Sequence, residues 1–181
     1  MVGRQVTGKR LGIIGMGRIG QVTAQRARGF DMTILYSNRS RLAPDLEKGA
    51  TYYQTVEDML PHCDYLALHC PATLETLHLL NAKRIALLPD GAIVVNTARG
   101  SVVDDEALVS ALKSGKLAAA GLDVFNNEPG NIHPAYRELE NTFLLPHIGS
   151  ATVETRDAMG FRALDNLDAI VAGREPHDRV A

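Results

Sequence analysis

The chain has 181 residues, of which 45% are hydrophobic and 22% are charged, and its formal net charge is −2. This composition is typical of a globular protein of about one domain, and the small net charge argues against nucleic acid as the main partner. No apolar stretch approaches the length of a membrane span and no secretion signal is visible, so we expect no membrane partner.

Short β-rich runs alternate with helical patterns along the chain. The predicted strands are Arg10–Ile14, Thr33–Tyr36, Tyr65–His69, Ala92–Asn96, Ala118–Asp123 and Phe143–Leu145. The predicted helices are Gly17–Arg28, Val56–Leu60, Asn81–Leu87, Asp104–Lys113 and Val153–Ala172. Several strands are continuous apolar runs, as in strands covered on both faces. The alternation predicts an α/β fold with a doubly wound parallel sheet, as a single domain over residues 1–181.

Two local signals refine this prediction. Acidic residues at 104–106 suit the first turn of a helix, and Gly115 suits its end. The stretch from Asn126 to Asn141 contains Pro129 and Pro134, and it predicts a long loop with room for one helical turn. Long loops in compact domains are often functional.

Gly15, Gly17 and Gly20 form a GxGxxG pattern between the first predicted strand and the first predicted helix. In that context the glycines permit a tight turn, a close approach of the backbone to a pyrophosphate, and close helix–strand packing. The helix start then directs backbone N–H groups at the phosphates. The pattern predicts a Rossmann-type dinucleotide-binding turn, and the alternative is a glycine-rich surface turn.

The residues after the second predicted strand favour NADP(H) over NAD(H). NAD-binding folds place an acidic residue there for the ribose hydroxyls, whereas this chain has Asn38, Arg39, Ser40 and Arg41. Arginine offers a fork of donors to a 2′-phosphate. We therefore expect Arg39, helped by Asn38, Ser40 or Arg41, to bind the phosphate. A solvated basic loop that contacts no ligand is the alternative.

Three residues with acid–base or anion-binding chemistry follow predicted strands, where ligands bind in open α/β sheets. Arg99 can bind a carboxylate, His147 can exchange a proton near neutral pH, and Glu128 can favour the imidazolium form of His147. Each residue alone could equally have a structural or surface role. Among the other histidines, His69 is interpreted as a packing or hydrogen-bonding residue at a strand end.

Cys63 and Cys70 are the only cysteines. In a domain of this size without a secretion signal they predict reduced, inert thiols in a cytoplasmic protein. The absence of CxxC and HExxH spacing argues against a metal site.

Taken together, the motifs resemble the NAD(P)-binding domain of the D-isomer-specific 2-hydroxyacid dehydrogenases, particularly the glyoxylate/hydroxypyruvate reductase branch. The resemblance covers almost the whole chain. The matching segments are Gly8–Gly20, Leu60–Asn81, Leu88–Gly100, Gly121–Phe125 with Glu128 and Pro129, and Pro146–Thr152.

The resemblance implies roles for single residues. Arg99 would hold the substrate carboxylate and polarise its carbonyl. His147 would be the general acid in reduction and the base in oxidation, with Glu128 as its partner. Arg18 and Ile19 would present their backbones to the pyrophosphate, next to Gly15, Gly17 and Gly20. Cys70 and Pro71 would line the adenine side, and Thr97, Ala98, Asp123, Gly149 and Ser150 would lie around the nicotinamide. Thr76 is a further expected cofactor contact, and Asn38, Arg39 and Ser40 stay the residues expected at the 2′-phosphate.

The implied reaction is hydride transfer to the carbonyl carbon of a 2-oxoacid, while His147 protonates the oxygen. Glyoxylate and hydroxypyruvate are the expected substrates. In an enzyme with both domains, His147→Gln is expected to lower turnover far more than cofactor affinity.

Family members carry a second, substrate-side domain, built mostly from residues before the cofactor domain. We expect this chain to be a fragment without that domain, which binds dinucleotide but shows little or no reductase activity. An open nicotinamide site would lack the exclusion of water that such chemistry uses.

Two other functions are compatible with the sequence. A dinucleotide-sensing or scaffold module would need no acid–base pair, so Arg99, Glu128 and His147 favour the enzyme. A phosphoglycerate dehydrogenase-like enzyme is disfavoured by Asn38 and Arg39. The family resemblance also implies a homodimer formed through the cofactor domain, with which the apolar and aromatic residues before His147 are compatible.

Overall fold

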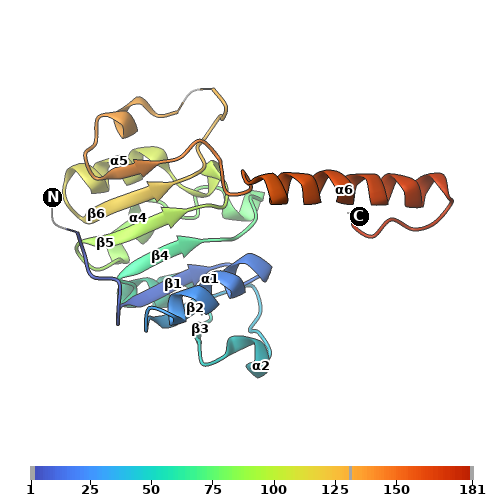
Figure 1. Ribbon diagram of the computed structural model, residues 1–181. Helices are drawn as coiled ribbons and strands as arrows, with labels where there is room; N and C mark the ends of the chain where they lie inside the picture. The colour runs from blue at the N-terminus through green and yellow to red at the C-terminus, as the bar shows by residue number, and fades with distance from the viewer. Residues whose placement is uncertain (1–2, 131, 180–181) are drawn as a thin grey trace. The chain divides into compact units, whose positions relative to one another are not determined.

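The computed structural model describes residues 3–130 and 132–179. The chain divides into two compact units, residues 1–146 and 147–181, which we describe separately. The first unit contains one sheet (Figure 1), and within the described residues its strands are β1 Arg10–Ile14, β2 Thr33–Ser37, β3 Thr51–Tyr53, β4 Tyr65–Leu68, β5 Ala92–Asn96, β6 Leu117–Leu122 and β7 Thr142–Leu144. The helices of this unit are α1 Arg18–Arg28, α2 Pro44–Glu47, α3 Val56–Met59, α4 Ala82–Leu87 and α5 Asp105–Lys113.

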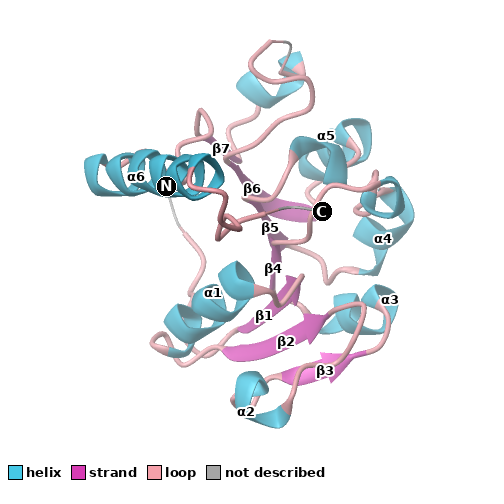
Figure 2. Ribbon diagram, turned by 90° about the vertical axis from the view of Figure 1, so that its right-hand side faces the viewer, coloured by secondary structure: helices cyan, strands magenta, loops and turns pink. Residues whose placement is uncertain are grey.

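All neighbouring strands pair in parallel, in the order β3-β2-β1-β4-β5-β6-β7. The chain therefore moves outward from β1 to β3, returns to the other side of β1, and continues outward to β7. Figure 2 shows α1 on one face of the sheet and α3, α4 and α5 on the other. The predicted doubly wound Rossmann-type sheet is confirmed, and β1 and β4 form its switch point.

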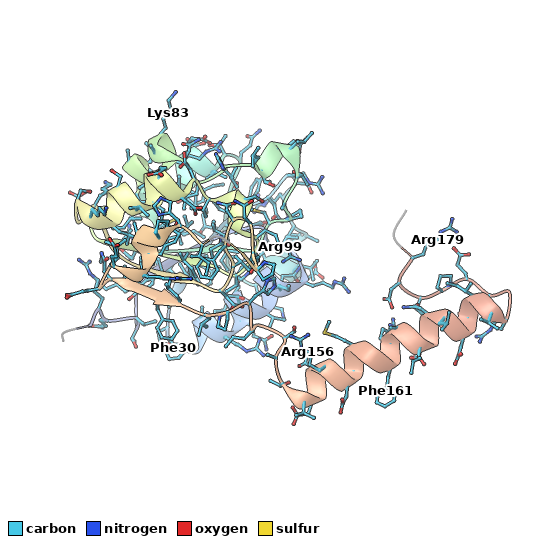
Figure 3. All side chains as sticks on the ribbon, turned by 90° about the horizontal axis from the view of Figure 1, so that it is seen from above. Phe30, Lys83, Arg99, Arg156, Phe161 and Arg179 are labelled. Atoms are coloured by element: carbon cyan, nitrogen blue, oxygen red, sulfur yellow. The ribbon has the colours of Figure 1, made fainter. Side chains whose placement is uncertain are left out.

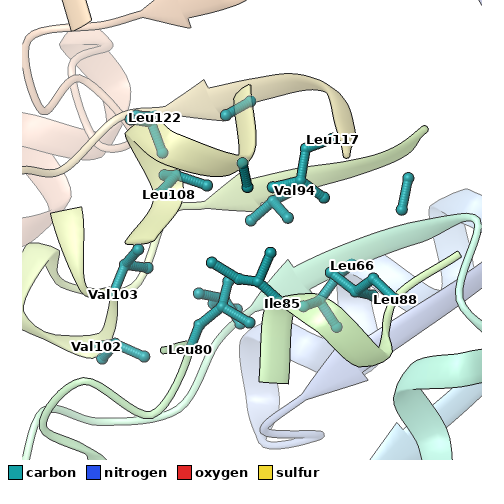
Figure 4. Packing of buried hydrophobic residues seen from close by; sticks show 14 of the residues in the cluster. Leu66, Leu80, Ile85, Leu88, Val94, Val102, Val103, Leu108, Leu117 and Leu122 are labelled. Atoms are coloured by element: carbon teal, nitrogen blue, oxygen red, sulfur yellow. The ribbon is translucent and has the colours of Figure 1, made fainter. Parts of the chain in front are cut away.

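Two apolar cores hold these layers together. The larger one packs strand residues such as Leu66 and Val94 against Ile85 of α4 and Leu108 of α5 (Figure 4). The smaller one packs Ile13 and its neighbours against α1. Each fully buried Leu or Ile contributes about 1.5–3 kcal/mol relative to an exposed one, so these cores dominate the stability of the first unit.

In the first unit, the starts of α3, α4 and α5 are capped by side chains. Thr55 accepts a hydrogen bond from the backbone N–H of Asp58, Asn81 from that of Arg84, and Asp104 from that of Ala107. Such caps satisfy backbone donors that a helix start leaves unpaired. Gly115, at a φ of +76°, follows α5 as predicted.

Some predicted details differ from the structure. The strand β3 and the short helix α2 were not predicted. The long loop contains one helical turn, the 3₁₀ helix Pro134–Arg137, as expected. Full cover on both faces holds for most of β1, but β5 alternates buried and half-buried residues, so one of its faces is only partly covered.

The second unit consists mainly of α6, Val153–Val171. Thr152 caps this helix by accepting a hydrogen bond from the backbone N–H of Thr155 at 3.2 Å. Figure 3 shows Phe161 projecting from α6, and its side chain is 67% exposed. None of the described helices is long and apolar enough to cross a membrane.

Candidate functional site

The glycine-rich turn joins β1 to α1 at the switch point of the sheet. Gly15 has a φ of +96°, and a Cβ atom there would lie 2.6 Å from the backbone nitrogen of Cys70. The turn is therefore pressed against the backbone that follows β4. A Cβ on Gly20 would meet the carbonyl oxygen of Gly15, so helix and turn also pack closely.

The start of α1 presents free backbone donors beside open space. Its N-cap residue is Gly17, no side chain of the described residues caps the helix, and the first turn contains no acidic residue. A Cβ on Gly17 would meet no atom within 4 Å. Because the N-terminus of a helix attracts anions, this arrangement fits the pyrophosphate of a dinucleotide.

A cleft of about 520 Å³ opens at the carboxyl ends of the strands, beside this turn. A volume of that size is typical of small-molecule and cofactor sites. Eight of the predicted cofactor residues line it: Gly15, Gly17, Asn38, Arg39, Ser40, Cys70, Pro71 and Thr76.

The loop after β2 supplies one wall of the cleft. The Asn38 side-chain oxygen accepts a hydrogen bond from the backbone N–H of Met16 at 2.7 Å, so it links this loop to the glycine-rich turn. Arg39 and Ser40 are exposed. Arg41 does not line the cleft, because its guanidinium binds Glu47 at 2.8 and 3.0 Å.

The segment after β4 supplies the opposite wall. Thr76 donates a hydrogen bond to the carbonyl of Pro71 at 2.7 Å and accepts one from the backbone N–H of Thr73 at 2.8 Å, which fixes the turn between them. Cys70 is buried, and burial raises the pKa of its thiol, so it is an uncharged packing group.

Ten further residues line the cleft that were not predicted as cofactor contacts, among them Gln54, Glu57, His69 and Arg84. Glu57 accepts a hydrogen bond from Arg84 Nε at 2.7 Å, so the two charges pair with each other. Gln54 follows the unpredicted strand β3. No motif marks Gln54, Glu57 or Arg84, because their positions in the cleft depend on how distant elements pack. His69 lies within the matching segment Leu60–Asn81, but it was interpreted as a packing residue.

His69 lies directly after β4, as the sequence predicted for a strand-end residue. Its Nδ1 atom lies 3.4 Å from the Thr97 hydroxyl, and its Nε2 atom is buried without a hydrogen-bond partner in the described part of the chain. Burial lowers the pKa of this histidine, so it is neutral at physiological pH.

A second group of predicted residues gathers at the ends of β5 and β6. The buried Asn96 accepts a hydrogen bond from the Ala98 N–H and donates one to the Arg99 carbonyl, both at 3.0 Å. This turn leaves Thr97 and Arg99 exposed (Arg99 is labelled in Figure 3). The backbone N–H of Asp123 donates to the Asn96 carbonyl, so Asp123 is held beside the same turn.

The backbone also brings Glu128 towards this turn. A Cβ on Gly100 would overlap the backbone of Phe125, so the chain after Arg99 touches the chain that leads to Glu128. Glu128 itself is half-buried. Arg99 and the Asp123–Glu128 segment thus form a polar region at the carboxyl end of the sheet.

The remaining predicted residues lie elsewhere. The Arg18 side chain lines a separate hollow with residues of α1 and α2, although its backbone belongs to the glycine-rich turn. Ile19 is 69% exposed. His147, Gly149 and Ser150 belong to the second unit, where His147 is exposed and has a φ of +55°. In the described residues no group of three or more His, Cys, Asp or Glu side chains could hold a metal ion.

Comparison with known proteins places this geometry in a family. Residues 1–149 match the model of the "D-isomer specific 2-hydroxyacid dehydrogenase, NAD binding domain". A glycerate dehydrogenase of Hyphomicrobium methylovorum is 45% identical over 177 residues, which are 97% of this chain and 55% of the relative. A glyoxylate reductase of Thermococcus litoralis is 44% identical over 179 residues, 99% of this chain and 54% of the relative. The chain thus spans about half the length of the curated relatives it matches.

Solved structures give the same result. The crystal structure of a glyoxylate reductase from Paecilomyes thermophila superposes with a TM-score of 0.89 at 44% identity, over 93% of this chain and 51% of that one. An NADPH-dependent glyoxylate/hydroxypyruvate reductase from Sinorhizobium meliloti, solved with NADP and malonate, has a TM-score of 0.91 at 40% identity, over 96% of this chain and 53% of that one.

Proposed function

The chain belongs to the D-isomer-specific 2-hydroxyacid dehydrogenases, whose NAD-binding domain it forms, and we propose that it serves an NADPH-preferring reductase of small 2-oxoacids. Relatives named glyoxylate reductase and glycerate dehydrogenase support this substrate class. Glyoxylate and hydroxypyruvate are the proposed substrates.

The preference for NADPH rests on one observation. Arg39 stands two residues after β2, lines the cleft, and has no ion-pair partner among the described residues. No carboxylate follows β2 before Asp45, so nothing in the loop itself would repel a 2′-phosphate. The Sinorhizobium meliloti relative, which is described as NADPH-dependent, supports the same preference.

The cofactor supplies a hydride to the carbonyl carbon of the 2-oxoacid when it is bound. The Arg99 guanidinium, exposed at the end of β5, would bind the substrate carboxylate and draw electron density from the neighbouring carbonyl. His147 would donate a proton to the carbonyl oxygen as the hydride arrives, so that a 2-hydroxyacid leaves. Glu128 would stabilise the protonated imidazole of His147 before that step.

The proposed assembly is a homodimer formed through the cofactor domain. Phe143 is 68% exposed on β7, which is one of the two edge strands of the described sheet, and this supports an interface there. Light scattering of the purified chain would measure the mass directly. A cytoplasmic location also stays a prediction, supported by the two free thiols.

Titration of the 181-residue chain with NADPH and NADH tests the cofactor preference. Arg39→Ala should raise the NADPH Kd about 10- to 100-fold, since hydrogen bonds to charged groups contribute about 1.5–3 kcal/mol. The NADH Kd should change less than about threefold. Arg26→Ala, an exposed arginine of α1 outside the cleft, is the matched control and should leave both constants unchanged.

Three results would count against the proposal. Equal losses for both cofactors in Arg39→Ala would remove the phosphate assignment. A wild-type chain that binds NADH more tightly than NADPH would reverse the preference. A chain that binds neither would contradict the assignment of the cleft to a dinucleotide.

A further inference from the structure

A polar cluster built on a buried carboxylate lies next to the loop that carries Arg39. It consists of Tyr36 on β2, Arg41 in the loop and Glu47 on α2. The Glu47 carboxylate accepts a hydrogen bond from the Tyr36 hydroxyl at 2.6 Å and two from the Arg41 guanidinium at 2.8 and 3.0 Å. Glu47 is 6% exposed and Tyr36 is fully buried. A buried carboxylate is stable only when it is paired, and here the pairing is complete.

This cluster fixes one end of the loop. The backbone N–H of Leu42 donates to the Tyr36 hydroxyl at 3.0 Å, and the Arg41 guanidinium lies over the ring of Tyr52, 5.9 Å from its centre. Arg28 of α1 donates to the Glu47 carbonyl at 2.8 Å, which ties α2 to the helix that starts at the glycine-rich turn. The other end of the loop is fixed by the hydrogen bond between Asn38 and Met16.

Between these two anchors lie Arg39 and Ser40. Both are exposed and line the cleft, and neither side chain has a hydrogen bond or ion pair with the described residues. The backbone of the loop is therefore fixed, while the two side chains that face the cleft are available to a ligand. Because the loop backbone is already ordered before a ligand binds, less conformational entropy of the loop is lost on binding.

We propose that Tyr36, Arg41 and Glu47 are positioning residues, which set the selectivity for NADPH by holding the loop so that Arg39 and Ser40 face the 2′-phosphate. The two arginines of the loop then have different functions: Arg41 fixes the backbone through Glu47, and Arg39 binds the phosphate. This inference rests on the proposed function, because it concerns how the same cleft distinguishes the two cofactors.

Glu47→Gln tests the inference in the 181-residue chain. The substitution keeps the size of the side chain and removes the charge that holds Arg41. The NADPH Kd should rise about 5- to 10-fold, the range expected when a charge-assisted contact is misplaced rather than deleted, and the NADH Kd should change less than about twofold. Tyr36→Phe should shift the ratio of the two constants in the same direction, and this variant decides the question if Glu47→Gln does not fold.

Asp64→Asn is the matched control. It also breaks a paired Arg–carboxylate contact, between Arg10 and Asp64 at 2.9 and 3.0 Å, but at the opposite end of the sheet. It should leave the ratio of the NADPH and NADH constants unchanged. If Asp64→Asn moves this ratio as much as Glu47→Gln does, the effect is a general loss of stability and the inference is wrong.

A double variant distinguishes positioning from direct binding. If Glu47 acts through Arg39, then Arg39→Ala combined with Glu47→Gln should bind NADPH no more weakly than Arg39→Ala alone. Additive losses would overturn the inference. Tighter NADPH binding by Glu47→Gln would also overturn it, because a released Arg41 would then be the phosphate ligand. Failure of the proposed function itself would appear separately, as a wild-type chain without NADPH preference.

Discussion

The edge of the sheet at which its parallel strands begin and the edge at which they end both carry ion pairs, but they differ in whether a charged residue beside them is left without an ionic partner. At the edge where the strands begin, Arg10 binds Asp64 through two side-chain hydrogen bonds. Lys116 Nζ lies 2.8 Å from Asp90 Oδ1 at the same edge. At the edge where the strands end, Arg39 has no ion-pair partner in the described part of the chain. The first edge is closed by its own charges, whereas the second leaves a cation available beside a cleft.

Two asparagines at the second edge bind backbone groups rather than charged side chains. Asn38 holds the glycine-rich turn and Asn96 holds the turn that carries Arg99. These amides shape the loops without neutralising the charged groups next to them. We therefore predict that Arg39 and Arg99 are binding residues, because their neighbours fix the backbone and leave the charged groups exposed.

The largest expected effect comes from the glycines, where the two edges can be compared directly. Gly15→Ala combines a left-handed backbone with a clash against the Cys70 backbone, and should destabilise the fold by about 2–5 kcal/mol. Gly115→Ala at the other edge has the same kind of φ, +76°, but open space around it, and should cost only about 1–2 kcal/mol. Denaturant unfolding of both variants measures the difference.

Equal costs for the two variants would mean that the close approach of Gly15 to Cys70 is unimportant. Dinucleotide binding gives a second readout. Gly115→Ala should retain it, because Gly115 lies outside the cleft. Loss of binding in Gly115→Ala would break the distinction between the two edges.

Sequence reasoning succeeded where one segment carries its own signal. The GxGxxG pattern placed the turn correctly because each glycine answers a local requirement, and β1 was predicted with its observed bounds. The strand β3 was missed because Thr51–Tyr53 is too short to show a period, and it forms by pairing with β2. Because β3 was not predicted, Gln54, which follows it, was not recognised as a residue of the cleft.

The function of Arg41 could not be predicted for a related reason. In sequence it stands beside Arg39 with the same chemistry, and both are candidates for the phosphate. Only the packing of α2 against the loop brings Glu47 to Arg41. The roles of Arg99, Glu128 and His147 in the reaction stay predictions, since their assignment depends on a bound substrate.

A smaller effect is expected when the ion pair between Arg10 and Asp64, at the edge where the strands begin, is broken. Asp64→Asn should cost about 1 kcal/mol at neutral pH, the size of a partly exposed Arg–carboxylate pair, and should leave cofactor binding unchanged. The Arg10 guanidinium lowers the pKa of Asp64, so the pair stabilises the folded state above the unfolded pKa of about 3.9. That stability is lost as the pH falls through the lower folded value.

The unfolding free energies of wild type and Asp64→Asn should therefore converge below about pH 4. A constant difference down to strongly acidic pH would show that the charge of Asp64 is irrelevant. Weaker cofactor binding by this variant would connect the two edges, which the comparison treats as separate.

The smallest effect concerns His69, whose Nε2 atom is buried without a partner at the open edge. Since burial lowers its pKa, the unfolded chain takes up a proton near pH 6.5 that the folded chain resists, and stability falls as the pH drops below that value. His69→Leu should remove this part of the pH dependence. At about pH 7.5 it should change stability by less than about 1 kcal/mol, because it deletes an unpaired nitrogen and only a long 3.4 Å contact to Thr97. Thermal unfolding across the range from about pH 7.5 to 5.5 measures both quantities.

A loss of more than about 2 kcal/mol at the higher pH would mean that the imidazole has a strong internal partner. The strand ends would then be stabilised by their own polar groups, as the strand beginnings are, and an unpaired group there would no longer mark a binding edge.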